Sequence, residues 1–164
     1  DQFRMAGGKV QMNVGEMIQE LANLRSYETP ERTDAFPLLL AAGERRSHTA
    51  NTVIRDPAWM KSNNPTALSV HPEDANSIGL ADASRAKLVT KRGEAEVLIA
   101  HDDRMKRGTL SLPNGLGLLY PDTKGERVAH GISPNDLTDI EDRDPYAGTP
   151  WHKHVRARLE PLSA

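Results

Sequence analysis

A polar segment that follows a short apolar run contains the residues best suited to bind an anion. Residues 36–42 (FPLLLAA) are apolar and end at Gly43, where glycine lets the backbone turn sharply. The segment 44–52 (ERRSHTANT) then carries guanidinium, hydroxyl, imidazole and amide groups. Arginine pairs phosphate oxygens in a forked geometry, and short polar side chains add donors and acceptors. On composition alone an ordinary solvated loop is the simpler interpretation, because loops are polar whether or not they bind a ligand.

Composition excludes several classes of chemistry. The 164-residue chain has no cysteine, so it contains no disulfide, iron–sulfur ligand or thiolate nucleophile. Its 21 basic and 23 acidic residues give a formal net charge of −2, without the basic field that nucleic-acid-binding proteins use. His130, His152 and His154 have neither a cysteine nor a close carboxylate in the sequence to complete a zinc site, so we predict no metal site.

Length and the character of the N-terminus indicate a fragment of a longer protein. The length fits one domain with an extension. The chain does not begin with methionine, its first residues lack the apolar core of a signal peptide, and no apolar run is long enough to span a membrane. We expect a cytoplasmic protein, or a periplasmic one if the full-length chain carries an export signal.

The elements expected along the chain are short. Apolar residues recur at helical spacing over 14–24, and a charged linker with Pro30 follows over 25–35. We therefore divide the chain into an N-terminal extension, residues 1–35, and a main domain, residues 36–164. Strands are predicted over 36–42, 67–70, 86–90, 95–100, 109–112 and 155–159, with a helix over 71–79 that begins with Pro72. Residues 116–139 show no clear period, and we expect a long structured loop there. This pattern indicates a β-barrel with helical inserts.

Four stretches in succession resemble the C-terminal domain of the molybdopterin oxidoreductases, the group of formate dehydrogenase, nitrate reductase and dimethyl sulfoxide reductase. They are FPLLLAAGERRSHTANT (36–52), SVHPEDANSIGLADASRAKLVTKRGEAEVLIA (69–100), LPNGLG (112–117) and SPNDLTDIEDRDPYAGTPWHKH (133–154). No one of these motifs is specific, but their order and spacing are. The resemblance implies a mainly β fold with helical inserts, a double-psi six-stranded β-barrel of the aspartate decarboxylase type, with a short N-terminal helical extension.

The resemblance also implies a function. In the family this domain binds the nucleotide and pterin arms of molybdenum bis(molybdopterin guanine dinucleotide), while preceding domains of the same enzyme supply the iron–sulfur cluster and the protein ligand of the metal. The chain is then part of a molybdenum-dependent oxidoreductase and non-catalytic by itself, with no catalytic residue and no metal ligand of its own. The identities of the substrate and the redox partner are not implied.

The resemblance assigns the candidate cofactor-binding residues. The first cofactor loop of the family matches Arg45, Arg46, Ser47, His48, Asn51 and Thr52. Further along, the family pattern places His71 and Asp74 at a helix start, Asn114 in a glycine-bearing turn, Asn135 before a Leu-Thr pair and Lys153 near the last strand. Asp74 has the acceptor pair that guanine N1–H and N2–H require. Each residue has a structural alternative: acids complement a helix dipole, Asn135 is an N-cap, Asn114 stabilises a plain turn, and Lys153 is solvated.

This sequence departs from the family pattern at three positions. His71 replaces an asparagine, Ala83 replaces the glycine of an Asp-Gly-Asp turn, and Leu116 lies where a tryptophan is common. Alanine reaches a positive φ less readily than glycine, so we expect the turn at Ala83 to differ from that of the family.

Two other functions are compatible with such a barrel. The first is a stand-alone double-psi barrel that serves as a substrate-recognition or protein-interaction module without a cofactor. The second is a self-processing decarboxylase of the same barrel type, which needs a Gly-Ser cleavage site, and the chain contains no Gly-Ser pair.

Overall fold

The computed structural model describes residues 10, 12–23, 32–44, 66–144 and 146–162. Its contacts divide the chain into two compact units, Asp1–Glu31 and Arg32–Ala164. The first contains helix α1 (Gly15–Asn23), which confirms the helix predicted over residues 14–24. The apolar side chains that define its periodicity, Val14, Met17, Ile18 and Leu21, are all exposed within the described part of the chain.

The larger unit is a closed barrel of six strands in the order β1-β5-β2-β4-β3-β8. The strands are β1 (Leu38–Glu44), β2 (Leu68–Val70), β3 (Arg85–Thr90), β4 (Glu94–His101), β5 (Thr109–Pro113) and β8 (Val155–Pro161). Strand β1 pairs with β5 and β2 pairs with β4 in parallel, while the other four pairs are antiparallel. Every predicted strand is therefore confirmed, and closure leaves the barrel without a free edge.

The barrel interior is filled by aliphatic side chains that alternate along the strands. In β8, for example, Val155, Ala157 and Leu159 are buried while the residues between them are not, which is the period of two expected for strands with one buried face. Because aromatic residues are scarce, leucine and isoleucine provide most of the volume. The largest fully buried aliphatic side chains are Leu40, Leu68, Leu88, Ile99, Leu110, Leu112 and Leu137.

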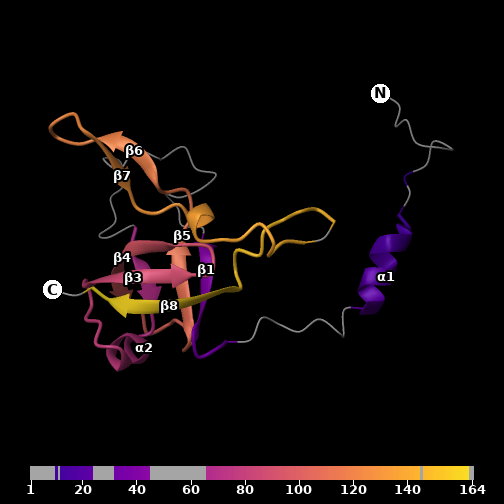
Figure 1. Ribbon diagram of the computed structural model, residues 1–164, viewed down its shortest axis with the longest axis horizontal. Coiled ribbons are helices and arrows are strands. Elements are labelled where there is room, and N and C mark those ends of the chain that lie inside the picture. The colour runs from indigo at the N-terminus through magenta and orange to yellow at the C-terminus, as the bar shows by residue number, and fades with distance from the viewer. Residues whose placement is uncertain (1–9, 11, 24–31, 45–65, 145, 163–164) are drawn as a thin grey trace. The chain divides into compact units, whose positions relative to one another are not determined.

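A short helix, α2 (Pro72–Ser77), lies at one end of the barrel (Figure 1). The His71 side chain caps it, because Nδ1 accepts a hydrogen bond of 3.1 Å from the Glu73 N–H. Pro72 occupies the first turn, where the missing N–H costs nothing. Gly79 ends the helical segment with a φ of +76°. The sequence signals of Pro72 and Gly79 therefore place this helix correctly.

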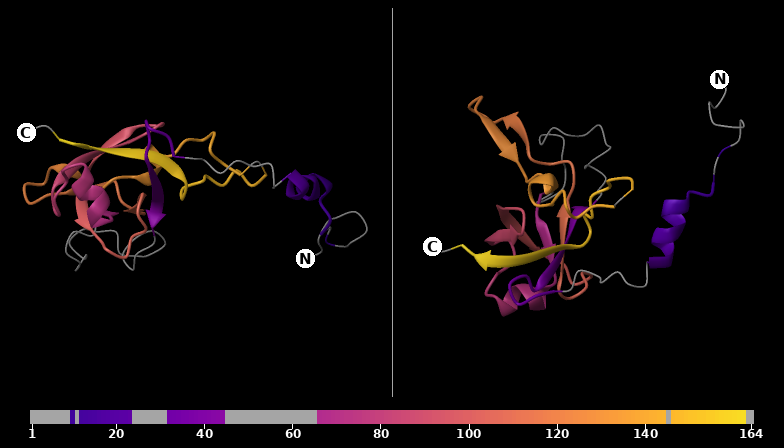
Figure 2. Two further views of the ribbon diagram at one scale, coloured as in Figure 1. Left: turned by 90° about the horizontal axis from the view of Figure 1, so that it is seen from below. Right: turned by 45° about the vertical axis from the view of Figure 1, so that its right-hand side comes forward.

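A two-stranded hairpin lies at the opposite end of the barrel from α2, as Figure 1 and the right-hand view of Figure 2 both show. It consists of β6 (Leu118–Pro121) and β7 (Arg127–His130) and is followed by the 3-10 helix η4 (Pro134–Asp136). The prediction of a long loop over residues 116–139 is therefore wrong in part. Most residues of the hairpin are exposed on both faces, so its sequence lacks the apolar alternation by which strands are recognised.

The turn at Ala83 keeps a positive φ although it lacks glycine. Ala83 has a φ of 58°, and within the described residues it is the one residue other than glycine with a positive φ. Its N–H donates to the Ile99 carbonyl at 3.0 Å, and Ser84 Oγ donates to the Ala81 carbonyl at 2.6 Å. Alanine thus adopts here the left-handed conformation that glycine reaches more readily, and the expected difference from the family's turn stays a prediction. These hydrogen bonds offset the strain of a left-handed alanine.

Gly117 permits the segment before β6 to lie close to Ser133, and a side chain at position 117 would separate them. Its φ is +86°, and a Cβ added there would lie 2.6 Å from the backbone nitrogen of Ser133. We expect Gly117→Ala to lower the free energy of unfolding by about 3 kcal/mol, near the upper end of ordinary single substitutions. Urea unfolding of the chain measures this change.

Gly125→Ala, in the turn between β6 and β7, is the matched control. Gly125 also has a positive φ, +83°, but an added Cβ would meet no atom within 4 Å among the described residues. Only backbone strain then contributes, and we expect a loss of about 1 kcal/mol. Equal effects of the two substitutions would show that the contact between Gly117 and Ser133 is unimportant.

Candidate functional site

Strand direction assigns the candidate residues to two opposite ends of the barrel. Strands β1 and β5 are parallel, so Glu44 and Asn114, at or just after their carboxyl ends, lie at the same end. We call this the Glu44 end. Strand β2 is antiparallel to β5, with Val70 opposite Leu110, so the residues that follow β2 lie at the other end. We call that the α2 end.

The Glu44 end is held together by backbone hydrogen bonds between segments that are distant in sequence. The Asn114 N–H donates to the Glu44 carbonyl at 2.9 Å, and the Ala42 N–H donates to the His152 carbonyl at 2.6 Å. Ser111 Oγ donates to Glu44 Oε2 at 2.5 Å. These contacts fix the start of the polar segment 44–52 beside the turn that follows β5 and beside the residues that precede β8.

Asn114 is half-buried and directed toward the point where β1 ends. Its Oδ1 accepts a hydrogen bond of 2.6 Å from the Gly115 N–H. Its Nδ2 is the atom nearest to the missing side chain of Gly43, 3.8 Å from an added Cβ. The Asn114 amide therefore has one side engaged in its own turn, as the structural alternative requires, and presents its NH₂ group toward β1.

Asn135 and Lys153 are both exposed at the Glu44 end. Asn135 lies inside η4, whose N-cap is Ser133, so the interpretation of Asn135 as the cap is wrong. Thr90 Oγ1, at the turn between β3 and β4, donates to the Leu137 carbonyl at 2.9 Å and fixes the end of η4 to this side of the barrel. Lys153 precedes β8 by two residues. The structure thus brings Asn114, Asn135 and Lys153 to one end.

Two histidine ring nitrogens near this end, Nε2 of His130 and Nδ1 of His152, are buried without a hydrogen-bond partner among the described residues. Neither histidine is among the cofactor-binding residues predicted from the sequence. Burial lowers the pKa of His130, so its ring is neutral near pH 7. An unpaired buried nitrogen costs about 1–3 kcal/mol. No sequence signal distinguishes these histidines from His154, which is exposed.

The six candidates of the first loop lie outside the described residues. They are Arg45, Arg46, Ser47, His48, Asn51 and Thr52. Their assignment stays a prediction. The described structure fixes where their segment begins, at Glu44.

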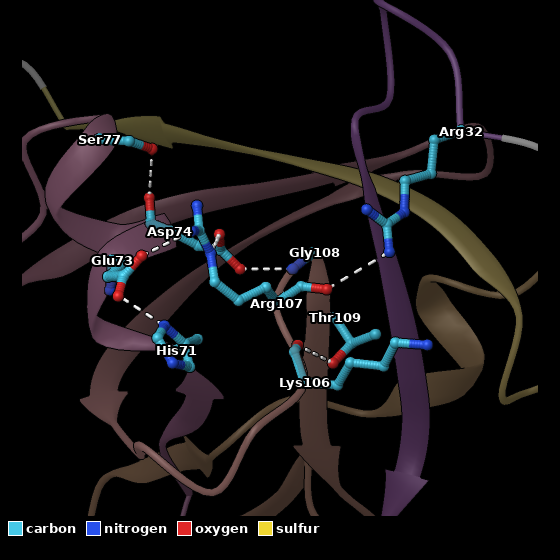
Figure 3. Close-up of polar contacts among 9 residues, drawn as sticks. All are labelled: Arg32, His71, Glu73, Asp74, Ser77, Lys106, Arg107, Gly108 and Thr109. Carbon is cyan, nitrogen blue, oxygen red and sulfur yellow. Dashed lines mark hydrogen bonds and ion pairs between the residues drawn. The ribbon is translucent and has the colours of Figure 1, made fainter.

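His71 and Asp74 lie at the α2 end, separated from the other candidates. Figure 3 shows Asp74 facing the segment that leads into β5. Asp74 Oδ1 accepts a hydrogen bond of 3.0 Å from Arg107 Nε, and Oδ2 accepts one of 2.5 Å from the Gly108 N–H. Arg107 Nη1 also donates to Glu73 at 2.5 Å. The arginine thus bridges both acids of the first turn of α2.

The environment of Asp74 keeps its carboxylate ionised. The side chain is only 11% exposed, and this burial acts to raise its pKa, but the Gly108 N–H and the Arg107 guanidinium outweigh that effect and lower the pKa. Arg107 and Gly108 are hydrogen-bond partners of Asp74 that the sequence did not reveal, because they lie more than thirty residues from it and only barrel closure brings them together.

The described residues contain neither a metal cluster nor a membrane-spanning helix. No group of three or more His, Cys, Asp or Glu residues among them is arranged to hold a metal ion. No helix in the described ranges is long and apolar enough to cross a membrane.

Comparison with known proteins gives one family and several relatives. Residues 38–156 match the family described as molydopterin dinucleotide binding domain. The chain is 29% identical over 87 residues to acetylene hydratase of Syntrophotalea acetylenica, a match that covers 52% of this chain and 12% of that protein. It is 37% identical over 60 residues to a tetrathionate reductase polypeptide of Archaeoglobus fulgidus, a match that covers 36% of this chain and 5% of that protein.

A solved structure, acetylene hydratase from Pelobacter acetylenicus, has the same fold. The TM-score is 0.65 at 21% sequence identity, over 83% of this chain and 21% of that chain. Together with the closed six-stranded barrel, this likeness confirms the predicted double-psi barrel. The chain spans a small part of each of these proteins.

The contact of Asp74 with Arg107 and Gly108 predicts a pH-dependent contribution to stability. A carboxylate whose pKa is lowered by folding stabilises the protein above its unfolded pKa, about 4, and loses that contribution as the pH falls further. We expect Asp74→Asn to lower the free energy of unfolding at pH 7 by about 1.5–3 kcal/mol, the value of hydrogen bonds to a charged group. The variant should also lose less stability than the parent chain between pH 4 and pH 2.

Glu73→Gln is the control, because both partners of its contact with Arg107 are more than half exposed. Exposed ion pairs contribute only about 0–1 kcal/mol. Urea unfolding over a pH series measures both variants, and equal effects at pH 7 would contradict the assignment.

Proposed function

Since the chain belongs to the molydopterin dinucleotide binding domain family, we propose that it binds molybdenum bis(molybdopterin guanine dinucleotide), holding the nucleotide and pterin arms. The observation that carries this proposal is the convergence of polar groups at the Glu44 end of the barrel. The Asn114 amide, the Lys153 ammonium and two buried imidazole nitrogens lie there, where the segment 44–52 begins.

The chemistry of these groups fits a pterin dinucleotide. A pterin edge offers both donors and acceptors, which suit an amide and imidazole nitrogens, and a pyrophosphate requires cations. Lys153 provides one cation next to the barrel, and the family resemblance assigns Arg45 and Arg46 to the same role. Burial of the unpaired nitrogens of His130 and His152 is costly unless a ligand completes their hydrogen bonds.

We assign the α2 end to the guanine base. Asp74 is ionised, as an acceptor for guanine N1–H and N2–H must be, because its pKa is lowered. Arg107 donates one hydrogen bond to Oδ1 of Asp74, and Gly108 donates one to Oδ2. A carboxylate has about four lone-pair sites for hydrogen bonds. Asp74 therefore keeps acceptor capacity. In this assignment the cap His71 positions the first turn of α2, and the two ends of the barrel bind different parts of the cofactor.

We further propose that the chain is one domain of a molybdenum-dependent oxidoreductase and does not catalyse alone. The bound cofactor would supply oxygen-atom transfer, or hydride or proton-coupled electron transfer, at its metal. The residues of this chain bind and orient the dinucleotide, and preceding domains of the same enzyme would complete the site. The alternative of an interaction module without cofactor is not favoured, because the family match spans residues 38–156.

The test of this function is cofactor analysis of the purified full-length protein. We expect molybdenum, measured by inductively coupled plasma mass spectrometry, together with a guanine nucleotide released by acid hydrolysis. The absence of both, in protein from cells that load a known molybdenum enzyme, would contradict the proposal.

Single substitutions at the Glu44 end should weaken cofactor retention without unfolding the barrel. We expect Asn114→Ala and Lys153→Ala to accelerate cofactor loss by about 10- to 100-fold, as expected for the loss of one hydrogen bond to a charged or polar group. Gel filtration followed by molybdenum analysis over time measures the rate. Lys124→Ala, at an exposed turn of the β6–β7 hairpin, is the control and should retain the cofactor at the parental rate.

A further inference from the structure

Two histidines at the Glu44 end differ in their hydrogen bonding from the other described histidines that are partly buried. His130 Nε2 and His152 Nδ1 are each excluded from solvent, and neither has a partner among the described residues. His101, which is also half-buried, has its Nε2 3.1 Å from the Leu80 carbonyl, and His71 Nδ1 accepts from the Glu73 N–H. His71 and His101 therefore each have a ring nitrogen in a hydrogen bond with the protein. The buried nitrogens His130 Nε2 and His152 Nδ1 have no such bond among the described residues.

The backbone of each of these two residues is fixed by a hydrogen bond to an element of the Glu44 end. The His152 carbonyl accepts a hydrogen bond of 2.6 Å from the Ala42 N–H of β1. The His130 carbonyl accepts one of 2.9 Å from the Gly117 N–H, in the segment that follows Asn114. Strand β1 and the Asn114 turn are the elements that form the Glu44 end, so both residues lie at the end that we propose for the cofactor.

A metal ion is a poor explanation for the two unpaired nitrogens. Zinc sites need three or four protein ligands, and the described residues contain no group of three His, Cys, Asp or Glu side chains around either ring. A strained structural role is equally poor, because a buried nitrogen without a partner destabilises the protein that contains it. A ligand with polar atoms would complete the hydrogen bonds of both nitrogens.

We propose that His130 Nε2 and His152 Nδ1 bind the molybdopterin dinucleotide directly, each through one hydrogen bond to a polar atom of the cofactor. This inference rests on the proposed function. The two residues lie outside the set assigned by family resemblance, because the family motif identifies Lys153 rather than its neighbour His152. Burial, which lowers the pKa of His130, also indicates that this ring serves the neutral pterin edge rather than a phosphate, which would favour the imidazolium form.

The proposal predicts opposite effects of one substitution on the loaded and cofactor-free protein. We expect His130→Leu and His152→Leu in the full-length protein to shorten the half-life of bound molybdenum and guanine nucleotide at least about tenfold. The same variants should leave the thermal midpoint of the cofactor-free protein unchanged or raised, because leucine replaces an unpaired polar group by an apolar one. A buried histidine with a structural role would show the reverse pattern.

Two neighbouring histidines are matched controls. His101→Leu removes a satisfied ring at the α2 end, and should lower the thermal midpoint while leaving the cofactor half-life unchanged. His154→Leu replaces an exposed ring two residues from His152 and should change neither quantity.

Amide substitutions identify the atom that makes each contact. Asparagine places a polar group near the position of Nδ1 and glutamine near that of Nε2. His152→Asn and His130→Gln should therefore retain most of the cofactor half-life, whereas His152→Gln and His130→Asn should not. The comparison of these asparagine and glutamine variants also tests the proposal if a leucine variant does not fold.

The outcomes separate the two hypotheses. If the parental protein carries molybdenum and guanine nucleotide but the leucine or mismatched amide variants release them at the parental rate, the histidine assignment is wrong and the proposed function stands. If the parental full-length protein carries neither, the proposed function fails, and the histidine assignment fails with it.

Discussion

The parallel pairing of β1 with β5 is the constraint on which the candidate site depends. Parallel neighbours end at the same side of a sheet, so the turn after β5 lies beside the polar segment that begins at Glu44, and Asn114 and Glu44 share a 2.9 Å hydrogen bond. Antiparallel β8 begins where β1 ends and brings His152 and Lys153 to the same place. A register shift of one residue would turn the buried Leu40 outward, so core packing and site geometry are specified together.

At the other end, one carboxylate links stability to the proposed recognition of guanine. Asp74 joins the first turn of α2 to the start of β5 through Arg107 and Gly108, and this same contact lowers its pKa and keeps it ionised. Gly108 has a φ of +74°, a left-handed conformation that favours glycine, and the end of the flexible Arg32 side chain lies over it. The α2 end therefore holds its acceptor through protein contacts, while the Glu44 end leaves polar atoms unpaired.

Local signals in the sequence predicted most of the barrel. Short apolar runs and apolar alternation identified all six strands, and Pro72 with Gly79 identified α2, because strand burial and helix capping depend on adjacent residues. The β6–β7 hairpin was missed because its residues are mostly exposed on both faces. The Ala83 turn kept its positive φ because hydrogen bonds to Ile99 and Ala81 compensate for the missing glycine, and no sequence pattern reveals those bonds. The partners of Asp74 and the unpaired rings of His130 and His152 depend on closure of the barrel, so spacing along the chain could not identify them.

The most direct test is a structure of the full-length protein with its cofactor, determined by crystallography or cryo-electron microscopy. The account predicts that the pterin and pyrophosphate of a molybdopterin dinucleotide lie against the Glu44 end, within hydrogen-bond distance of Asn114, His130 and His152. It also predicts that a guanine base lies against Asp74 at the α2 end. A cofactor located on another surface of the barrel, without contact to Asn114, His130 or His152, would contradict it.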